Sequence, residues 1–218
     1  AKPEVIYNTA TGFTADTFEQ VTAADPTQII AVNQAVDSRT KGSLEEIAPT
    51  TVKPNGYEDW QVPWEKQVET IADAVGKEDE GDKLIDDTEK AFEEFRHEHA
   101  ELQDKSAAIV MPYDGKIGLY TEEDGRGQFI EDLGMEIPDA LQGDGGSFFV
   151  DIAPENYAKL NQVDYLFVLD YNGSSDALKK DKTFQGLDIV KDDRVRYLDT
   201  DTGNAMSMPN PVTIPWAV

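Results

Sequence analysis

One arginine stands where it could bind an anion. Arg126 lies between two glycines, at a point where the sequence predicts that a helix begins. A guanidinium at a helix N-terminus can pair with an anionic ligand through two hydrogen bonds, and free backbone N–H groups add to the attraction. The alternative is a structural ion pair with a neighbouring acid, Glu122, Glu123 or Asp124. Both interpretations stay open.

Three aromatic residues cluster on a segment that contains proline and glycine. Tyr57, Trp60 and Trp64 lie within or just after residues 50–63. Aromatic side chains can stack on a flat ligand because they offer a large contact area at low entropic cost. Trp64 is better explained as the first core residue of a helix, whereas Tyr57 and Trp60 are candidates for ligand binding.

The elements that must position these residues alternate between helix and strand. Apolar spacing predicts helices over 17–24, 64–75 and 154–160, another that begins at Gly125, and strands over 28–32, 107–111, 116–120, 165–169 and 195–198. Ser43 is expected to cap a helical turn through Glu46. This alternation is typical of an α/β protein.

In open α/β sheets, ligands bind beyond the carboxyl ends of the strands. The residues that follow the predicted strands are Asn33, Gln34, Tyr113, Asp114, the loop 121–127 with Arg126, Asp170, Tyr171, Asn172 and the segment 199–208, which contains Asn204 and Met206. Aromatic and amide groups dominate this set. They suit ligand binding better than bond breaking.

Catalytic and metal-binding patterns are missing from the sequence. It has no cysteine, no nucleophile-elbow serine, and no phosphate-binding or dinucleotide-binding glycine motif. His97 and His99 are two apart on a predicted helix and therefore face apart. Residues 199–204 resemble the start of a calcium loop, but Asn210 stands where the bidentate glutamate belongs. We therefore predict no catalytic residue, no metal ligand and no resident cofactor.

The charge of the chain excludes two classes of partner. Its 44 acidic and 19 basic residues give a formal net charge of −25. Such a chain repels phosphate backbones and anionic lipid headgroups, so we expect no nucleic-acid or membrane-surface binding. No segment reaches the roughly 18 apolar residues of a transmembrane helix, and residues 1–8 do not form a signal peptide.

A long helical pattern divides the chain. Residues 83–105 repeat apolar positions every seven residues, and a helix of this length spans roughly 30 Å. A weak internal repeat flanks it: Phe18, Val21, Asp25, Ile29 and Ile30 match Tyr157, Leu160, Asp164, Val168 and Leu169 at equal offsets. We predict two α/β lobes with parallel-type sheets, a partial N-terminal lobe over 1–82 and a C-terminal lobe over 106–218, joined by the helix.

Several segments together resemble the substrate-binding proteins of ATP-driven ferric-siderophore importers, in the class whose two α/β lobes are joined by one long helix. The segments that carry the resemblance are 18–31 (FEQVTAADPTQIIA), 44–50 (LEEIAPT), 64–77 (WEKQVETIADAVGK), 116–120 (KIGLY), 124–134 (DGRGQFIEDLG) and 148–156 (FFVDIAPEN). Each motif is weak alone. Their order and spacing cover nearly the whole chain.

The resemblance implies a receptor rather than an enzyme. Such a receptor captures an iron(III)-siderophore complex between its lobes and delivers it to an ABC permease in the membrane. It implies ligand contacts from Tyr57 and Trp60 in the first lobe and from Tyr113, Arg126, Tyr171, Asn204 and Met206 in the second. It further implies an extracytoplasmic protein, periplasmic or anchored to the cell surface as a lipoprotein. We expect a monomer.

Two departures from the family pattern carry expectations of their own. Family members have a further part of the first lobe before the region that matches Ala1, and a final helix after a segment like 214–218, so we expect the chain to be a fragment. Receptors for highly anionic catecholate chelates often present several basic residues, whereas Arg126 is nearly alone here. This favours a hydroxamate or mixed chelate of lower charge.

Two alternatives remain. The same scaffold could bind haem or a corrinoid instead of a siderophore. From a different class, the chain could be an acidic hydrolase that uses two carboxylates roughly 5–10 Å apart, although nothing in the sequence singles out such a pair.

Overall fold

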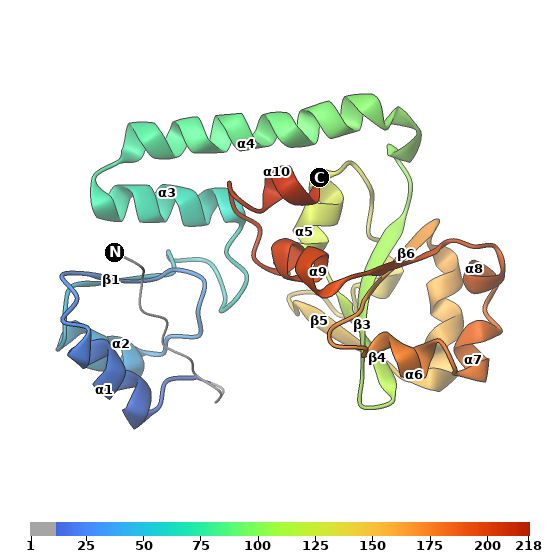
Figure 1. Cartoon of the computed structure of the whole chain (residues 1–218), viewed down its shortest axis with the longest axis horizontal. Helices are drawn as coiled ribbons and strands as arrows, with labels where there is room; N and C mark the ends of the chain where they lie inside the picture. The colour runs from blue at the N-terminus through green and yellow to red at the C-terminus, as the bar shows by residue number, and fades with distance from the viewer. Residues whose placement is uncertain (1–11) are drawn as a thin grey trace. The chain divides into compact units, whose positions relative to one another are not determined.

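The computed structural model describes residues 12–218, and the chain divides into two compact units. Unit 1 comprises Ala1–Val62 and Lys66–Gly81, and unit 2 comprises Pro63–Glu65 and Asp82–Val218. Helices and strands alternate along both units (Figure 1), which confirms the α/β class. The expectation for residues 1–8 lies outside the described residues. The assignment of the units to lobes over 1–82 and 106–218 stays a prediction.

Unit 1 is built around a pair of short parallel strands, β1 (Ile29–Ala31) and β2 (Thr50–Val52), with Ile29 opposite Thr50. Helices α1 (Ala15–Ala23) and α2 (Ser38–Glu45) precede one strand each, and most of α3 (Trp64–Val75) follows them. The predicted cap at Ser43 is wrong. Asp37 caps α2 by accepting a hydrogen bond from the backbone N–H of Thr40, so the helix begins five residues before Ser43.

Unit 2 contains a five-stranded sheet in the order β5-β4-β3-β6-β7. The strands are β3 (Ala107–Tyr113), β4 (Lys116–Tyr120), β5 (Phe149–Ile152), β6 (Tyr165–Leu169) and β7 (Val195–Leu198). Strands β3, β6 and β7 are parallel, while β4 is antiparallel to both β3 and β5. Asp114 and Gly115 turn the β3–β4 hairpin, both with positive φ.

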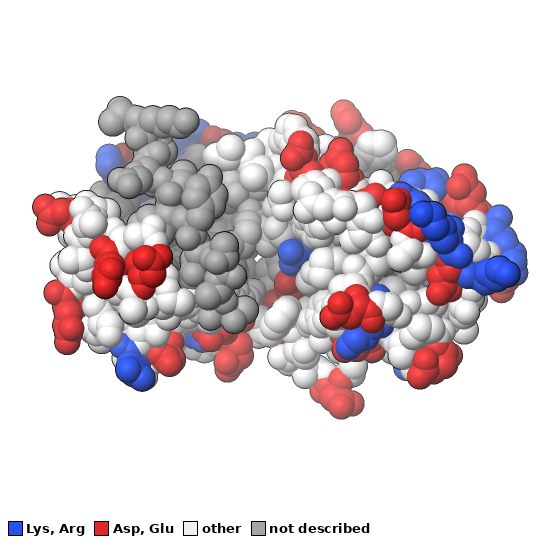
Figure 2. Space-filling model, turned by 60° about the horizontal axis from the view of Figure 1, so that its bottom comes forward, with Lys and Arg blue, Asp and Glu red and all other residues white. Residues whose placement is uncertain are grey.

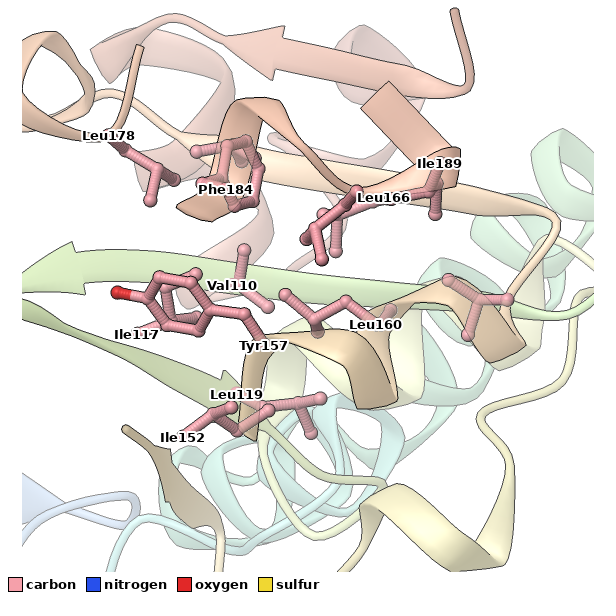
Figure 3. Packing of buried hydrophobic residues seen from close by; sticks show 14 of the residues in the cluster. Val110, Ile117, Leu119, Ile152, Tyr157, Leu160, Leu166, Leu178, Phe184 and Ile189 are labelled. Atoms are coloured by element: carbon pink, nitrogen blue, oxygen red, sulfur yellow. The ribbon is translucent and has the colours of Figure 1, made fainter. Parts of the chain in front are cut away.

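Alternation along the strands gives the sheet of unit 2 two apolar faces. One face packs against η3 (Pro154–Gln162), α6 (Ser175–Leu178), α7 (Lys182–Gln185) and α8 (Asp188–Lys191). Figure 3 shows Val110, Leu119 and Leu166 of the sheet meeting Leu160 of η3 and Phe184 of α7 in this core. These residues are fully buried or nearly so.

The other face of the sheet carries α5 (Gly125–Asp132), which contacts β3 and α9 (Thr200–Ser207); α10 (Ile214–Ala217) contacts α9. In Figure 1 these three helices lie on the opposite side of the sheet from α6, α7 and α8. Two short 3₁₀ segments, η1 (Ala100–Leu102) and η2 (Asp139–Leu141), complete the unit. The ends of the unit 2 strands, which carry the predicted site residues of that unit, therefore lie between two layers of helices.

The long helix differs from its predicted bounds of 83–105. Helix α4 spans Glu78–Glu98. It begins earlier because Glu78, Asp79 and Glu80 place three negative charges at its N-terminus, where the helix dipole favours them. It ends earlier because His99 leaves the helical conformation, with φ −118° and ψ 48°. No helix of residues 12–218 is long and apolar enough to cross a membrane.

The net charge of the chain predicts a stability that depends on salt. Many described lysines pair with acids one turn away on the same helix, as Lys83 does with Asp87. Because the 44 acidic residues outnumber the 19 basic ones, most carboxylates still keep uncompensated charge. Salt screens this repulsion. We expect the Tm to rise by roughly 4–8 °C between low and molar KCl, which corresponds to about 2 kcal/mol for a chain of this size. Thermal unfolding measured by circular dichroism tests this, and a Tm that falls with KCl contradicts it.

Candidate functional site

Aromatic side chains cover the face of the unit 2 sheet that carries α5 and α9. Tyr113 and Tyr120 stand on the same face because alternate residues of β3 and β4 point the same way and Ile109 pairs with Tyr120. Phe149, which pairs with Tyr120 across β4 and β5, lies between them, with ring centroids 5.5 Å from Tyr113 and 5.4 Å from Tyr120. The absence of a side chain at Gly118 leaves room for the Phe149 ring.

Arg126 joins this aromatic group and is paired with Asp124. Its guanidinium carbon lies 4.1 Å from the ring centroid of Tyr120, a cation–π distance. Its Nη1 donates to both carboxylate oxygens of Asp124, at 3.0 and 3.1 Å. Asp124 also accepts from the backbone N–H of Arg126 and so caps α5. Of the two interpretations of Arg126, the structure contains the ion pair, and the acid is Asp124.

Burial makes this ion pair electrostatically important. The exposed fractions of the Arg126 and Asp124 side chains are 16% and 8%. Burial raises the pKa of Asp124, and the charge of Arg126 opposes that shift. For Arg126, burial lowers the pKa, but the charge of Asp124 and the contact with Tyr120 together raise it by more, so the net direction is upward. Each charge therefore offsets part of the desolvation cost of the other.

The two glycines beside Arg126 are required by packing. A Cβ atom on Gly127 would lie 1.9 Å from the carbonyl oxygen of Thr121, and one on Gly125 would lie 2.9 Å from Cδ of Pro209. The first turn of α5 therefore lies directly against the loop that leaves β4. This contact fixes where Arg126 stands, so the two glycines help to position the arginine.

Tyr171 follows β6 and reaches α9. A Cβ atom on Gly203 would lie 3.0 Å from the Tyr171 hydroxyl oxygen, so this glycine also permits a close approach. The hydroxyl is buried and has no hydrogen-bond partner in the protein, and the same holds for Nε of Arg126. Buried polar atoms without partners are uncommon.

The segment 199–204 is a helix start and not a loop. Asp199 caps α9 by accepting from the backbone N–H of Thr202 at 2.9 Å. The resemblance to a calcium loop is therefore wrong in conformation. On α9, Met206 is buried and Asn204 is exposed.

Tyr113 at the end of β3 is engaged at the hairpin. Its hydroxyl donates to Asp151 of β5, and Nζ of Lys116 contacts the same carboxylate at 2.5 Å. The hydrogen bond to Asp151 raises the pKa of Tyr113. A cavity of about 280 Å³ lies beside this hairpin and is lined partly by Tyr113 and Leu178. It falls just below the usual volume range of ligand pockets, about 300–1,000 Å³.

The site residues predicted in unit 1 lie beyond the carboxyl end of β2. Tyr57 is half-buried, and Trp60 is 38% exposed. Trp60 has φ 68°, an uncommon conformation for a bulky residue and one that is often held at functional positions. The segment is anchored because the backbone N–H of Val62 donates to Oδ1 of Asn33, the residue beyond β1. Trp64 is buried in unit 2, as its core interpretation predicted.

The predicted set missed three residues that the structure connects to Arg126 and Tyr113. Tyr120, Phe149 and Asp124 were not selected, although Asp124 was considered as an ion-pair partner. The period of two along 116–120 places Tyr120 on one face and could have identified it. Phe149 could not be found this way, because its place depends on the pairing of β4 with β5.

A second acidic group on α5 has an altered pKa. Partial desolvation of the carboxyl group, together with the charges of Glu122 and Asp132, raises the pKa of Glu131 to about 7. Both Glu131 and Glu122 are exposed as residues, and Glu122 accepts a hydrogen bond from Gln142.

This shift predicts how stability depends on pH. The folded chain holds a proton on Glu131 more tightly than the unfolded chain between pH 4.5 and about 7, so the contribution of this group is lost as the pH rises through about 7. We expect Glu131→Gln to raise the Tm at about pH 8 and to flatten its pH dependence above about pH 5. Thermal unfolding across this range tests it, with Glu155→Gln, an exposed glutamate of η3, as the control. Equal pH profiles for Glu131→Gln and the wild type would refute it.

Comparison with known proteins places the chain among binding proteins. Residues 7–202 match the family model described as periplasmic binding protein. No curated protein matches the chain significantly.

Solved structures give the same result. The iron uptake ABC transporter substrate-binding protein PiaA from Streptococcus pneumoniae TIGR4 is 26% identical with a TM-score of 0.79, over 96% of this chain and 73% of that one. PiaA in complex with ferrichrome is 26% identical with a TM-score of 0.78, over 91% and 68%. Staphylococcus aureus SirA complexed with staphyloferrin B is 21% identical with a TM-score of 0.71, over 92% and 71%, and shows likeness of fold alone.

Proposed function

Because the chain belongs to the periplasmic binding protein family, we propose that it is an extracytoplasmic receptor that captures a ferric siderophore and delivers it to an ABC importer. The likeness to PiaA, which was solved with ferrichrome bound, supports this ligand class. The observation that carries the proposal is the aromatic face of unit 2, where Tyr113, Phe149 and Tyr120 lead to Arg126. Aromatic rings and a guanidinium offer broad contact area without a nucleophile.

The proposed ligand contacts are Tyr57 and Trp60 in unit 1 and Tyr113, Arg126, Tyr171, Asn204 and Met206 in unit 2, to which we add Tyr120 and Phe149. Met206 is buried and would contribute through packing, while Asn204 is exposed and can hydrogen-bond directly. In this proposal iron is cargo rather than a resident cofactor. The receptor works as a monomer, either free or held at the cell surface by a lipid anchor.

Intrinsic fluorescence provides the test, since the chain has three tryptophans in different environments. Trp64 is buried, whereas Trp60 and Trp216 are 38% and 60% exposed. Titration with ferrichrome should quench the wild-type emission with a Kd in the micromolar range or below. The proposed function is refuted if neither ferrichrome, a ferric catecholate nor ferric staphyloferrin B binds. Haem and a corrinoid, which would give absorbance changes on mixing, test the same scaffold with other ligands.

The position of Trp60 gives a specific prediction for this titration. If Trp60 contacts the chelate, Trp60→Phe should remove most of the quenching and weaken binding by about tenfold, since buried aromatic contacts in binding sites are typically worth 1 kcal/mol or more. Trp216→Phe is the matched control, and it should keep the ligand-dependent quenching. A Trp60→Phe variant that is quenched as strongly as the wild type, with the same Kd, would remove Trp60 from the site.

A further inference from the structure

The positive charge of Arg126 is already neutralised within unit 2. Asp124 holds the guanidinium through two contacts, while Tyr120 covers it from another side. Asp124 also accepts a hydrogen bond from the backbone N–H of Arg126 at the start of α5. An anionic ligand at this helix N-terminus would otherwise use that donor. The helix start and the arginine therefore present no net positive charge.

The surroundings of this pair are acidic. Glu122 and Glu123 stand on the same loop from β4 to α5, and Glu122 is exposed. The whole chain carries −25, and Figure 2 shows acidic side chains spread across the face drawn rather than gathered in one patch. An anion that approached this loop would meet two unneutralised carboxylates and no free charge on Arg126 to offset them.

We propose that Asp124 sets the charge selectivity of the receptor: by neutralising Arg126, it makes the site accept an uncharged ferric chelate and reject anionic ones. This inference rests on the proposed function. Three singly charged hydroxamates cancel the three positive charges of ferric iron and give a neutral complex. Three doubly charged catecholates leave a trianion, and carboxylate chelates are also anionic. The receptor is therefore one for a trihydroxamate-type chelate, an uncharged complex whose oxygens accept hydrogen bonds without needing an uncompensated cation.

The first experiment compares chelates of different charge on the wild-type chain. Ferrichrome is the neutral probe, a ferric tris-catecholate siderophore is the trianion, and ferric staphyloferrin B is the carboxylate chelate. Quenching titrations at low ionic strength should give ferrichrome the lowest Kd, by at least about tenfold, because unscreened repulsion is largest there.

The second experiment changes the charge of the pair. Asp124→Asn keeps a side-chain oxygen that can cap α5 but leaves Arg126 with a free positive charge. This variant should bind the tris-catecholate at least about tenfold more tightly than the wild type, and salt should weaken the gain. Glu155→Gln, which removes one negative charge from η3 on the other face of the sheet, is the control and should change this affinity by less than about twofold.

The outcomes separate this inference from the proposed function. If the wild type binds ferrichrome and the tris-catecholate equally well, the charge proposal is wrong while the receptor function stands. If no chelate binds, the function itself fails. A folded Asp124→Asn variant that gains nothing for the trianion overturns the role of Asp124. Should this variant not fold by circular dichroism, Glu123→Gln replaces it: a smaller gain in trianion affinity supports the charge argument, and no gain contradicts it.

Discussion

Gly127→Ala is expected to destabilise unit 2 by about 3 kcal/mol, at the upper end of the usual effect of overpacking, and to lower the Tm by roughly 6–12 °C. The added methyl carbon would lie 1.9 Å from the carbonyl oxygen and 2.5 Å from the carbonyl carbon of Thr121. These are backbone atoms that cannot rotate away. Thr121 is itself buried, and its hydroxyl donates to the carbonyl oxygen of Ser147, so the loop has little freedom to yield.

The same substitution should impair ligand binding. To relieve the clash, α5 must move away from the loop, and this displaces Arg126 relative to Tyr120 and alters the cap that Asp124 makes. We expect ferrichrome affinity to fall by about tenfold or more even at temperatures where the variant remains folded, because small displacements in a preorganised site have large effects. Thermal unfolding and the quenching titration, performed on the same sample, measure both effects.

Gly42→Ala is the matched control for this variant. Gly42 lies inside α2, and a Cβ atom there would have no neighbour within 4 Å. Alanine in a helix interior loses less backbone entropy on folding, so this substitution should stabilise unit 1 by about 0.5–1 kcal/mol. If both glycine variants show the same small change in Tm, the close approach of α5 to Thr121 is wrong.

The elements that could be predicted from the sequence are those with strong local signals. Helix 64–75 and strands 116–120, 165–169 and 195–198 have the predicted bounds, because apolar spacing and flanking turn residues define them. The start of α2 was missed because Asp37 was not recognised as its cap. The end of α4 was missed because the seven-residue repeat continues through His99 and Leu102 after the helix itself has stopped.

The site was harder to predict because it depends on contacts between distant segments. The sequence identified Arg126 and both of its possible roles, but an ion pair between residues two apart and a ligand contact produce the same local pattern. The aromatic face depends on the register of three strands, β3, β4 and β5. Tyr113 meets Tyr120 only through Phe149, which lies 28 residues after Thr121 in the sequence. Local spacing contains no information on that pairing.

Phe184→Ala is expected to cost about 3–5 kcal/mol, the usual range for removing a fully buried aromatic ring. Phe184 is 0% exposed, and its ring meets that of Tyr157 edge-on at 6.1 Å in the core of unit 2 (Figure 3). Its removal leaves a cavity between α7, η3 and the sheet. Because total stabilities are typically 5–15 kcal/mol, unit 2 would be close to unfolding.

The value of this variant lies in its position on the face of the sheet opposite to Arg126. If stability and binding are separable, Phe184→Ala should lower the urea midpoint strongly while the folded protein at low temperature still binds ferrichrome with nearly the wild-type Kd. Phe148→Ala is the control, since Phe148 is 39% exposed and its truncation should cost less than about 1 kcal/mol. A large loss of ferrichrome affinity in folded Phe184→Ala would mean that the core beneath β3 and β6 positions the site as directly as α5 does.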